Sequence, residues 1–551
     1  MMRSFRRGAM ATAVTLGAVF ALVLTACSPS PPSGTATGGT QPGGPRRGGT
    51  YTTGSIADAT SMQPLITNDT ASSTFQSLHY NAFLNSVDPD TLALVCKDGT
   101  CESSELSPDG KRLTYKLKPG LVWSDGTPLT SADYKFTYEK MIDPKVDYPA
   151  RTLTLSAIES VEAPDPLTLI FTFREAGFCP ALLFTNINPI PKHIFENLDI
   201  NDNPQNLRPT VGSGPWLLKE WVKDSYAIFE ANERFRFGRP NFDRYVIRIV
   251  KDQNVEYSMF KAGELDSISL RAEQWQEAIT LPNVTTYRFY APGSGYTFIG
   301  FNLDTPFFND VRVRRAVAMS IDRQAIIDRI RLGFARPVNS MLTPGTWAFA
   351  PDVPAVPYDP ARARQLLDEA GWRTPPNNPQ GIRVKDGREF RVRIFYNTGN
   401  KDREQIATVA QAQLRQVGIE LEVIQEEFSA FLNRVQRTKD LELYILGWTQ
   451  TLDPNSGRSI WTTGGSQNFS GYSNPRVDEA YERGAKAPGC TEAARQPFYA
   501  EIQRQIAADQ PYVFLYEPES LLALNSRIVP NELKRAGISY RIWEWYSRTG
   551  S

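Results

Sequence analysis

The region from residue 359 to residue 446 constrains the fold most, because it alternates between helix and strand patterns. Strands that alternate with helices form a parallel sheet whose faces the helices cover. We therefore predict an α/β fold for this part of the chain. The predicted elements are a helix that starts at Asp359–Pro360 and stops at Gly371, a strand over 390–394, a helix over 402–417 ended by Gly418, a strand over 419–423 and a buried strand over 441–446.

Other segments carry further helix and strand signals. Asp310 and Asp322 stand where N-cap residues precede short helices. Short strands and turns dominate between residues 86 and 210, so this stretch differs from the α/β region. The remaining predictions are a strand at 48–52, a helix over 72–84, strands over 112–117 and 167–173, a helix from Thr130 to Met141, a helix over 493–509 and a strand over 511–516.

Length and composition limit the class of protein. The chain has 551 residues, which is too long for one hydrophobic core, so two or three domains are expected. Hydrophobic residues at 41% and charged residues at 22% are typical of a soluble globular protein. The formal net charge is zero and no basic face is evident, so the sequence does not predict nucleic-acid binding.

The N-terminal segment has the pattern of an export signal. Three arginines, no acidic residue and an apolar run over 8–26 precede the sequence Leu24-Thr25-Ala26-Cys27. This end resembles the lipobox of bacterial lipoproteins, whose cysteine takes a diacylglycerol on sulfur and becomes the new N-terminus. We predict a signal peptide over 1–26 and lipidation of Cys27. The alternatives are an ordinary secretory signal and an uncleaved membrane helix, and Arg6-Arg7 leaves the choice between Sec and twin-arginine export open.

Residues 27–47 are predicted to form a flexible tether. The stretch consists almost entirely of Ser, Pro, Gly and Thr, which bury too little apolar surface to fold. As a random coil, a linker of this length spans roughly 25 Å. With a lipid at its start, it would hold the folded part close to a membrane.

Four further cysteines predict disulfide bonds. In an oxidising compartment an even number indicates disulfides, and four cysteines allow three connectivities. Cys96 and Cys101 flank the turn-like sequence Lys-Asp-Gly-Thr, which favours a local bridge between them and leaves Cys179 to pair with Cys490. The rival interpretation is a metal site, but the chain has only two histidines and no cluster of ligands. No metal or cofactor is predicted.

Three motifs resemble one known family. The segment from Trp123 to Asp133 resembles the signature of the bacterial extracellular solute-binding proteins, family 5, which bind dipeptides, oligopeptides, nickel and related ligands for ABC importers. Gly212–Trp216 resembles the family's Gly-Thr-Gly-Pro-Tyr turn, and the segments between 301 and 323 resemble its passage from strand to helix. Together the resemblance covers nearly all of the chain from 48 to 551.

The resemblance implies an α/β, periplasmic-binding-protein-like fold with mixed sheets. Two lobes would clasp the ligand, and a third lobe would be inserted. Hinges are expected near Gly300 and Tyr516. The implied division is lobe I over 48–85, 211–300 and 516–551, lobe II over 86–210, and lobe III over 301–515.

The loop after the strand at 441–446 is the first binding candidate. Loops at the carboxyl ends of parallel strands are where α/β sheets bind ligands. In the family's peptide binders an aspartate three residues after the tryptophan pairs with the peptide's α-ammonium group. Here that position holds Thr451, and the next acid is Asp453. This departure weakens the assignment of a peptide ligand.

The resemblance extends to other segments of the presumed cleft. The main chain of the early segment would pair with an extended ligand, and aromatic side chains would form an apolar wall. For each single residue, packing or a solvated turn is the alternative interpretation. The ligand-binding candidates are Asn68, Asp69, Thr70, Asn397, Thr398, Gly447, Trp448, Thr449, Thr451, Asp453, Trp461, Asn468, Phe469 and Ser470.

Catalysis is the competing class of function. The chain has neither a Gly-x-Ser-x-Gly elbow nor the zinc-protease histidine pattern, and no Gly-Lys-Ser/Thr follows Gly212-Ser213-Gly214. Acidic pairs such as Glu426-Glu427 usually mark a solvated face, although a secreted glycosidase would use two carboxylates in a cleft. We therefore predict no enzyme, with a secreted hydrolase and a purely structural surface lipoprotein as alternatives.

The sequence thus predicts a monomeric receptor that is lipid-anchored at the extracytoplasmic face of the cell membrane. It would bind oligopeptides or dipeptides between two lobes and deliver them to the permease subunits of an ABC importer. A non-peptide solute, such as an oligosaccharide, an opine or a metal chelate, is the alternative ligand.

Overall fold

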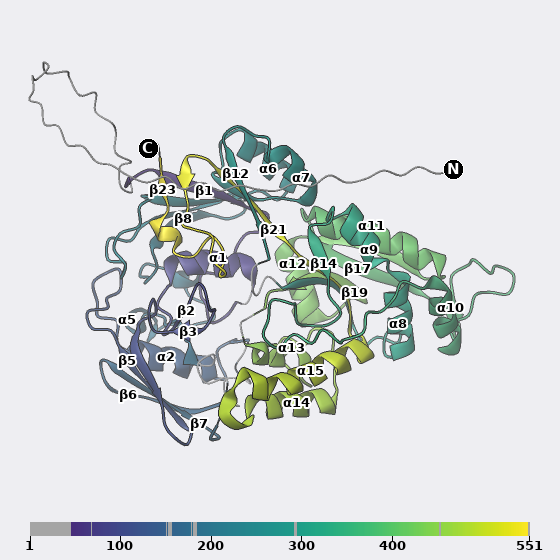
Figure 1. Cartoon of the computed structure of the whole chain (residues 1–551), viewed down its shortest axis with the longest axis horizontal. Helices are drawn as coiled ribbons and strands as arrows, with labels where there is room; N and C mark the ends of the chain where they lie inside the picture. Colours follow the sequence, from purple (N-terminus) through teal and green to yellow (C-terminus); the bar gives the residue numbers. More distant parts are fainter. Residues whose placement is uncertain are drawn as a thin grey trace, which may run out of the picture. The chain divides into compact units, whose positions relative to one another are not determined.

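The computed structural model describes residues 46–548 apart from 68, 150, 152–156, 178, 180–184, 291–294 and 451–452. The predicted signal peptide, Cys27 and most of the tether therefore lie outside the described residues, as do Asn68 and Thr451. Three sheets organise the rest, and residues 45–551 form one compact unit (Figure 1). Among the described helices, none combines the length and the apolar character that are needed to cross a membrane.

The first sheet has seven strands, drawn from both ends of the chain and from its middle. β1 lies parallel to its neighbours β10 and β11, and the other pairs are antiparallel. In spatial order the strands are β12 (Val284–Phe289), β21 (Ser520–Asn525), β11 (Ser267–Ser269), β1 (Thr50–Ser55), β10 (Arg244–Ile249), β9 (Tyr226–Ala231) and β8 (Trp216–Val222). The helices that accompany this sheet are α1 (Thr70–His79), α6 (Gln253–Lys261) and α7 (Ala272–Ala278).

The second sheet has six strands and contains the predicted α/β region. β17 lies parallel to both β18 and β19, as the alternation of strands and helices predicts, while β13 is antiparallel to its neighbours. The spatial order is β14 (Ala335–Pro337), β20 (Tyr512–Pro518), β13 (Tyr296–Phe301), β19 (Leu443–Trp448), β17 (Arg391–Asn397) and β18 (Glu420–Glu426). The sheet is therefore mixed, as the family resemblance implies.

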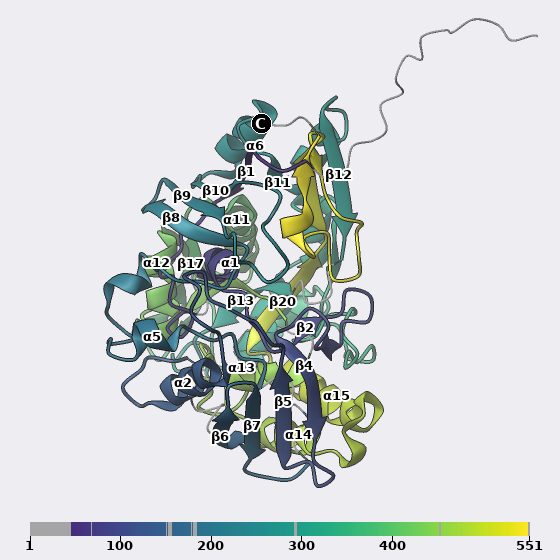
Figure 2. The same ribbon diagram turned by 90° about the vertical axis from the view of Figure 1, so that its left-hand side faces the viewer.

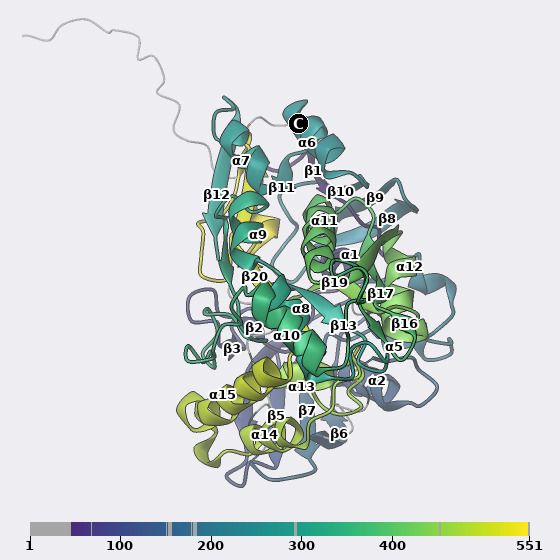
Figure 3. The same cartoon turned by 90° about the vertical axis from the view of Figure 1, so that its right-hand side faces the viewer.

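Helices on both faces of the six-stranded sheet enclose two apolar clusters. One cluster includes Val392, Ile406 and Leu414, and the other includes Phe298, Phe431 and Tyr512. Figure 3 shows α8, α9, α10 and α11 grouped beside this sheet. The helices are α8 (Val311–Ser320), α9 (Arg323–Arg329), α10 (Pro360–Glu369), α11 (Lys401–Gln416), α12 (Phe428–Asn433), α13 (Arg458–Trp461), α14 (Pro475–Ala485) and α15 (Glu492–Asp509).

The third sheet is antiparallel, and its core is separate from those of the other two. On β5 the buried positions alternate with more exposed ones, which matches the period-two pattern in the sequence. The strands are β4 (Cys101–Leu106), β5 (Arg112–Leu117), β7 (Thr168–Phe173) and β6 (Ile158–Asp165), with helices α2 (Ser131–Ile142) and α5 (Lys192–Phe195) and the small pair β2 (Ser86–Val87) and β3 (Leu94–Val95). The remaining short pairs are β15 (Val384–Lys385) with β16 (Arg388–Glu389) and β22 (Ile528–Val529) with β23 (Tyr546–Ser547).

Most predicted helix boundaries agree with the structure because their caps are local. The carboxylates of Asp310, Asp322 and Asp359 each accept a hydrogen bond from a backbone N–H in the first turn of the following helix. The helix predicted over 72–84 is wrong at its C-terminal end, since α1 stops at His79. The carbonyl of His79 accepts hydrogen bonds from the N–H groups of Ser213 and Gly214, which come from a distant segment.

The chain passes between the first two sheets at two places. One passage leads from β12 to β13, and the other passes through Glu519, which separates β20 from β21. Most of β13 and the end of β20 fall within predicted lobe I, yet both strands pair in the six-stranded sheet. Gly300 itself lies inside β13, where an added Cβ would come within 2.2 Å of the Tyr444 ring.

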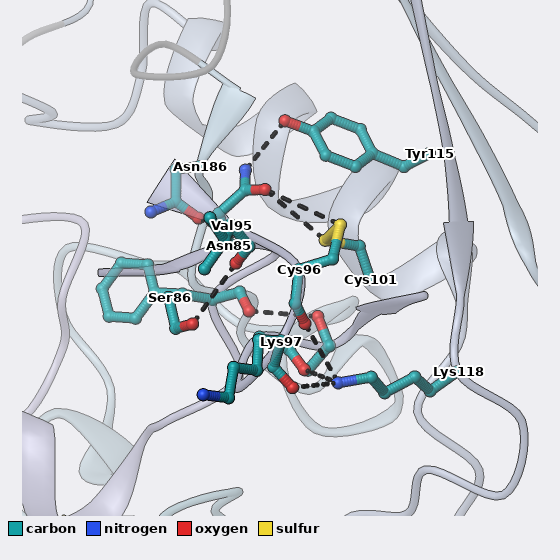
Figure 4. The surroundings of a disulfide bond; sticks show 12 residues. Asn85, Ser86, Val95, Cys96, Lys97, Cys101, Tyr115, Lys118 and Asn186 are labelled. Carbon is teal, nitrogen blue, oxygen red and sulfur yellow. Dashed lines mark hydrogen bonds between the residues drawn. A yellow bond between two sulfur atoms is a disulfide. The ribbon is translucent and has the colours of Figure 1, made fainter. Parts of the chain in front are cut away.

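Both predicted disulfides are present. Cys96 and Cys101 close a short loop whose carbonyl groups at Cys96, Lys97 and Gly99 accept hydrogen bonds of 2.8–3.0 Å from Lys118 Nζ (Figure 4). Cys179 and Cys490 are 311 residues apart in the sequence. The second bridge joins the segment after β7 to the turn between α14 and α15, which lie beside the four-stranded sheet (Figure 2).

Candidate functional site

A cavity of about 430 Å³ is lined by residues that accompany two different sheets. On the side of the seven-stranded sheet, it is lined by Ser55 at the end of β1, by the two residues that follow, and by the start of α1. Residues at the ends of β17 and β19 line it on the side of the six-stranded sheet. β1, β17 and β19 each have a parallel neighbour, and the cavity lies at their carboxyl ends, the usual location of ligand sites in α/β sheets.

Seven of the predicted ligand-binding residues line this cavity. Five of them lie on the side of the six-stranded sheet, at the end of β17, at and after the end of β19, and at position 469. The other two lie at the start of α1. The cavity's volume falls within the usual range for small-molecule sites, about 300–1,000 Å³. The seven residues are Asp69, Thr70, Asn397, Gly447, Trp448, Thr449 and Phe469.

Trp448 and Phe469 form part of an apolar wall. Their ring centroids are 5.3 Å apart, and Trp448 Nε1 donates a 3.3 Å hydrogen bond to the hydroxyl of Tyr512. This bond and the adjacent ring restrain the indole at the end of β19. Three aliphatic or aromatic residues that the sequence analysis did not select, Phe428, Leu432 and Ile460, extend the apolar lining.

Asp69 is the acidic residue of the cavity wall. It is 8% exposed, and its carboxylate accepts hydrogen bonds from the N–H of Ser72 at 2.8 Å and from the hydroxyl of Thr60 at 3.1 Å. Asp69 is therefore the N-cap of α1. The carboxylate completes the first turn of the helix and also holds the segment that leads into it.

Arg403 is the basic residue of the cavity wall and was missed by the sequence analysis. It lies in the first turn of α11, where Asn400 is the N-cap. Its Nη1 donates a 2.6 Å hydrogen bond to Asn397 Oδ1. A Cβ atom added at Gly447 would lie 3.9 Å from Arg403 Nη2, so the guanidinium sits beside the start of the predicted binding loop.

The charge of Arg403 persists at neutral pH. Burial lowers the pKa of its guanidinium to about 10, while the nearby Tyr516 and Asp402 act in the opposite direction. The helical pattern of α11 could have indicated a polar residue near the N-terminus. Nothing in that pattern distinguishes Arg403 from the solvated charged residues of the same turn.

Asp453 does not line the cavity. Its carboxylate accepts hydrogen bonds of 2.8 Å from both Nη1 and Nη2 of Arg495, and it also caps the short helix Pro454–Gly457. Only 6% of the Arg495 side chain is exposed. The acid that the sequence offers nearest to the expected aspartate position is thus paired with a buried arginine, while its own side chain is 19% exposed.

The other predicted residues in the described chain also lie outside the cavity lining. Trp461 is 1% exposed and packs against Tyr512, with 4.8 Å between ring centroids. Asn468 holds its own loop by donating hydrogen bonds to the carbonyls of Thr462 and Tyr472. The exposed Thr398 and the buried Ser470 complete this group.

The part of the chain that the structure describes places no metal centre beside the cavity. Among the described residues, no three His, Cys, Asp or Glu side chains lie close enough together to hold a metal ion. Among the described residues, the lining combines apolar side chains, amides and hydroxyls with one acid and one base. Such a set can bind and orient a ligand of mixed polarity.

Comparisons with known proteins agree on one family. Residues 97–470 match the model of "Bacterial extracellular solute-binding proteins, family 5 Middle". The oligopeptide-binding protein AppA of Bacillus subtilis is 29% identical over 505 residues, which cover 90% of each chain. Protein XP55 of Streptomyces lividans is 30% identical over 430 residues, which cover 77% of this chain and 76% of that protein.

A solved structure agrees over nearly the whole fold. The structure of Bacillus subtilis AppA in complex with a nonapeptide gives a TM-score of 0.85 at 28% identity. The match covers 91% of this chain and 99% of that one. The fold is therefore shared with a protein whose structure was solved in complex with a nonapeptide.

Proposed function

Because the chain belongs to the bacterial extracellular solute-binding proteins, family 5, we propose that it captures oligopeptides or dipeptides and delivers them to an ABC importer. The observation that carries this proposal is the cavity lined from two sheets at the carboxyl ends of parallel strands. The peptide ligand is supported by the similarity to AppA, whose structure contains a nonapeptide.

Capture would work by closure of two lobes on the ligand. Residues after β1 contact the cavity from one sheet, and residues after β17 and β19 contact it from the other. A ligand that touches both sides binds the closed arrangement more tightly than the open one, and only such a difference shifts the equilibrium toward closure. The two passages between the sheets, before β13 and at Glu519, are the places for the hinge.

The backbone beside the cavity suits an extended ligand. Residues 55–57 comprise the end of β1 and the two residues after it, and residues 447–449 comprise the end of β19 and the residue after it. A peptide lying between these segments would form main-chain hydrogen bonds in the manner of strand addition. Its side chains would meet the apolar wall that Trp448 and Phe469 form. These contacts would bind peptides of mixed sequence.

We further propose that the receptor is anchored through a lipid on Cys27 and performs no chemistry on its ligand. Neither proposal depends on the cavity. Mass spectrometry of the N-terminal peptide from the mature protein tests the first, since the expected product begins at a diacylated Cys27. An unmodified N-terminus upstream of Cys27 would contradict it.

Native mass spectrometry of the freshly purified protein tests the function. Denaturation should release peptides of mixed sequence and narrow length. Release of a single sugar or chelate would keep the receptor role but change the ligand. Cleavage of added peptides into fragments would indicate a hydrolase instead. If the protein is empty, added peptides should raise its melting temperature, and the increase should grow with the ratio of free peptide concentration to Kd.

A further inference from the structure

The two passages of the chain between the seven-stranded and six-stranded sheets run side by side. On the seven-stranded side, Phe289 at the end of β12 pairs with Ser520 at the start of β21. On the six-stranded side, Thr297 of β13 pairs with Tyr516 of β20. Two neighbouring connections of this kind act as a single joint, about which the two sides of the cavity can turn.

The region of the four-stranded sheet, residues 86–210, is held to the side of the seven-stranded sheet. Its chain arrives from α1 and continues to β8. Asp98 pairs with Arg541 at 2.7 Å, and the carbonyl of Ser124 accepts a 3.0 Å hydrogen bond from Arg234 Nη1. Both arginines belong to that side, one beside its apolar cluster and the other between β9 and β10. These two regions therefore form one side of the joint.

The disulfide between Cys179 and Cys490 connects this side to the other one. Cys179 follows β7 of the four-stranded sheet, and Cys490 lies between α14 and α15. These helices contribute Tyr481 and Tyr499 to the apolar cluster of the six-stranded sheet, which also contains Tyr512 of β20. The bridge is therefore a covalent link between the two sides of the cavity in addition to the joint.

Other contacts surround the bridge. The N–H of Cys179 donates a 2.8 Å hydrogen bond to the carbonyl of Ala485 at the end of α14, and Lys486 pairs with Glu175. The fully buried side chain of Ala485 belongs to the apolar cluster of the four-stranded sheet. In all three views α14 and α15 lie near the bottom, whereas β12, which leads into the joint, lies near the top (Figure 1, Figure 2 and Figure 3). This attachment thus lies away from the joint.

We propose that the bridge between Cys179 and Cys490 is a tether that limits how far the ligand cavity opens. The Cα atoms of bridged cysteines cannot separate by more than about 7 Å. Here they are already 5.0 Å apart. A body held at one joint can swing widely, but a second attachment away from that joint prevents a wide swing. The adjacent hydrogen bond and ion pair can break when the cavity opens, whereas the bridge stays intact.

The tether has a consequence for ligand exchange. This consequence rests on the proposed function, whereas the limit on opening does not. A cavity that opens only partly admits a peptide slowly and releases it slowly. Removing the tether should therefore raise both the association rate and the dissociation rate, so that Kd changes less than either rate.

Small-angle X-ray scattering of the ligand-free proteins tests the limit on opening. Co-purified ligand is removed in urea without reductant, and the proteins are refolded by dialysis. The wild type is compared with Cys179→Ser/Cys490→Ser and with the control Cys96→Ser/Cys101→Ser, which loses the bridge within one region. The first variant should have a radius of gyration larger by about 1 Å, against about 23 Å for a compact chain of this size. The control should match the wild type.

Two further comparisons isolate the bridge. Lys486→Gln removes the neighbouring ion pair and keeps the bridge, so it should stay as compact as the wild type. In the folded Cys96→Ser/Cys101→Ser protein, the remaining bridge is reduced with dithiothreitol, and the thiols are capped with iodoacetamide or joined by a bifunctional maleimide. The capped protein should be the most expanded. The maleimide-linked protein should be intermediate, because its linker is longer than a disulfide. Circular dichroism checks that each protein is folded.

A kinetic measurement tests the consequence for exchange. Fluorescein-labelled peptides of mixed sequence are bound to each protein and then released into an excess of unlabelled peptides, while fluorescence anisotropy is recorded. Release from Cys179→Ser/Cys490→Ser should be about tenfold faster than release from the wild type, or more. Release from Cys96→Ser/Cys101→Ser should be unchanged.

The outcomes separate the tether from the proposed function. If loss of the Cys179–Cys490 bridge expands the protein and the control stays compact, the tether stands. It stands even if the labelled peptides bind none of the proteins, a result that would contradict the proposed ligand instead. If the serine variant and the capped protein are as compact as the wild type, or if the control expands equally, the tether is overturned. Expansion with unchanged release would overturn the effect on exchange alone.

Discussion

Arg495 and Arg403 both lie on helices that accompany the six-stranded sheet, but their guanidinium groups have different surroundings. Arg495 holds both oxygens of Asp453, the carbonyl of Gly484 and the hydroxyl of Tyr499 at 2.8–3.0 Å. Arg403 holds the amide oxygen of Asn397. Arg495 thus forms four hydrogen bonds, two of them to a carboxylate, whereas among the residues that the structure describes no carboxylate lies within 4.0 Å of the Arg403 guanidinium.

The difference separates structural charges from charges that are available to a ligand. The pair of Arg495 and Asp453 stands where the sequence alone suggests a ligand-binding acid. In the folded chain that acid is used to join the loop after β19 to α15. Arg403, which carries no such sequence signal, is the basic residue among the described residues that line the cavity. Four predictions test this contrast.

Replacing Arg495 should have the largest effect on stability. Arg495→Ala leaves the carboxylate of Asp453 without its cation, and removing one partner of a buried ion pair costs about 3–5 kcal/mol. Urea unfolding with the disulfides intact measures the free energy of unfolding, and Arg437→Ala is the control for charge loss. If the free energy of unfolding decreases by less than about 1 kcal/mol, the pair does not stabilise the fold appreciably.

His79 is, like Arg495, a buried titratable group whose hydrogen-bond partners lie within the chain. Its Nδ1 accepts a 3.0 Å hydrogen bond from the N–H of Leu218, and Nε2 lies 3.1 Å from the carbonyl of Val211, so the ring is neutral. Burial lowers the pKa of His79 to about 4. Between pH 6.5 and 4 this histidine is protonated in the unfolded chain but stays neutral in the folded chain. The free energy of unfolding therefore falls as the pH decreases.

The free energy of unfolding should fall by about 3 kcal/mol between pH 6.5 and 4, since each pKa unit corresponds to about 1.4 kcal/mol. The measurement is the free energy of unfolding as a function of pH for the wild type and for His79→Gln. The variant starts from a different stability, but its slope between pH 6.5 and 4 should be shallower. Equal slopes in the two proteins would contradict the neutral, buried His79.

In the absence of ligand, replacing Arg403 should not lower the free energy of unfolding as replacing Arg495 does. Arg403→Met removes a partly buried cation that has no acidic partner, so the free energy of unfolding should rise by about 1 kcal/mol or stay unchanged. The same variant should lose affinity for peptides with a free carboxylate, because it removes the basic residue of the cavity wall. A destabilisation as large as that of Arg495→Ala would show that Arg403 is structural and would remove the contrast.

Gly447→Ala should have the smallest effect. The added methyl group would lie 3.2 Å from the carbonyl oxygen of Tyr296 and 3.9 Å from Arg403 Nη2. The strand can shift slightly, so the stability should change by about 1 kcal/mol or less. Calorimetry should show a loss of affinity for peptides with a free carboxylate of less than about tenfold. An unchanged affinity would mean that the ligand does not approach this edge of the guanidinium.

The sequence predicts the fold best where the signals are local. Caps such as Asp310 and the periodicity of β17 and α11 depend on neighbouring residues, and the structure agrees with them. The end of α1 was mispredicted because its last carbonyl is bound by Ser213 and Gly214. No pattern within residues 70–84 contains that information.

The site was harder to predict because its residues gain their roles from distant partners. Trp448 was selected because it follows a buried strand, and Asn397 because its segment resembles the family's turn after a strand; both line the cavity. Asp453 was selected by its distance from Trp448, but Arg495 binds it from 42 residues away. Arg403 was missed because a charged residue in a first helical turn is usually solvated, and only the fold brings it beside Gly447.

A crystal structure of the protein with its co-purified ligand tests the central claim most directly. The account predicts a carboxylate of the ligand at about 2.7–2.9 Å from nitrogen atoms of Arg403, with Asn397 still bound to Nη1. The bond between Arg495 and Asp453 should be unchanged. A ligand that occupies the cavity but leaves Arg403 bonded only to Asn397 and water would contradict the account.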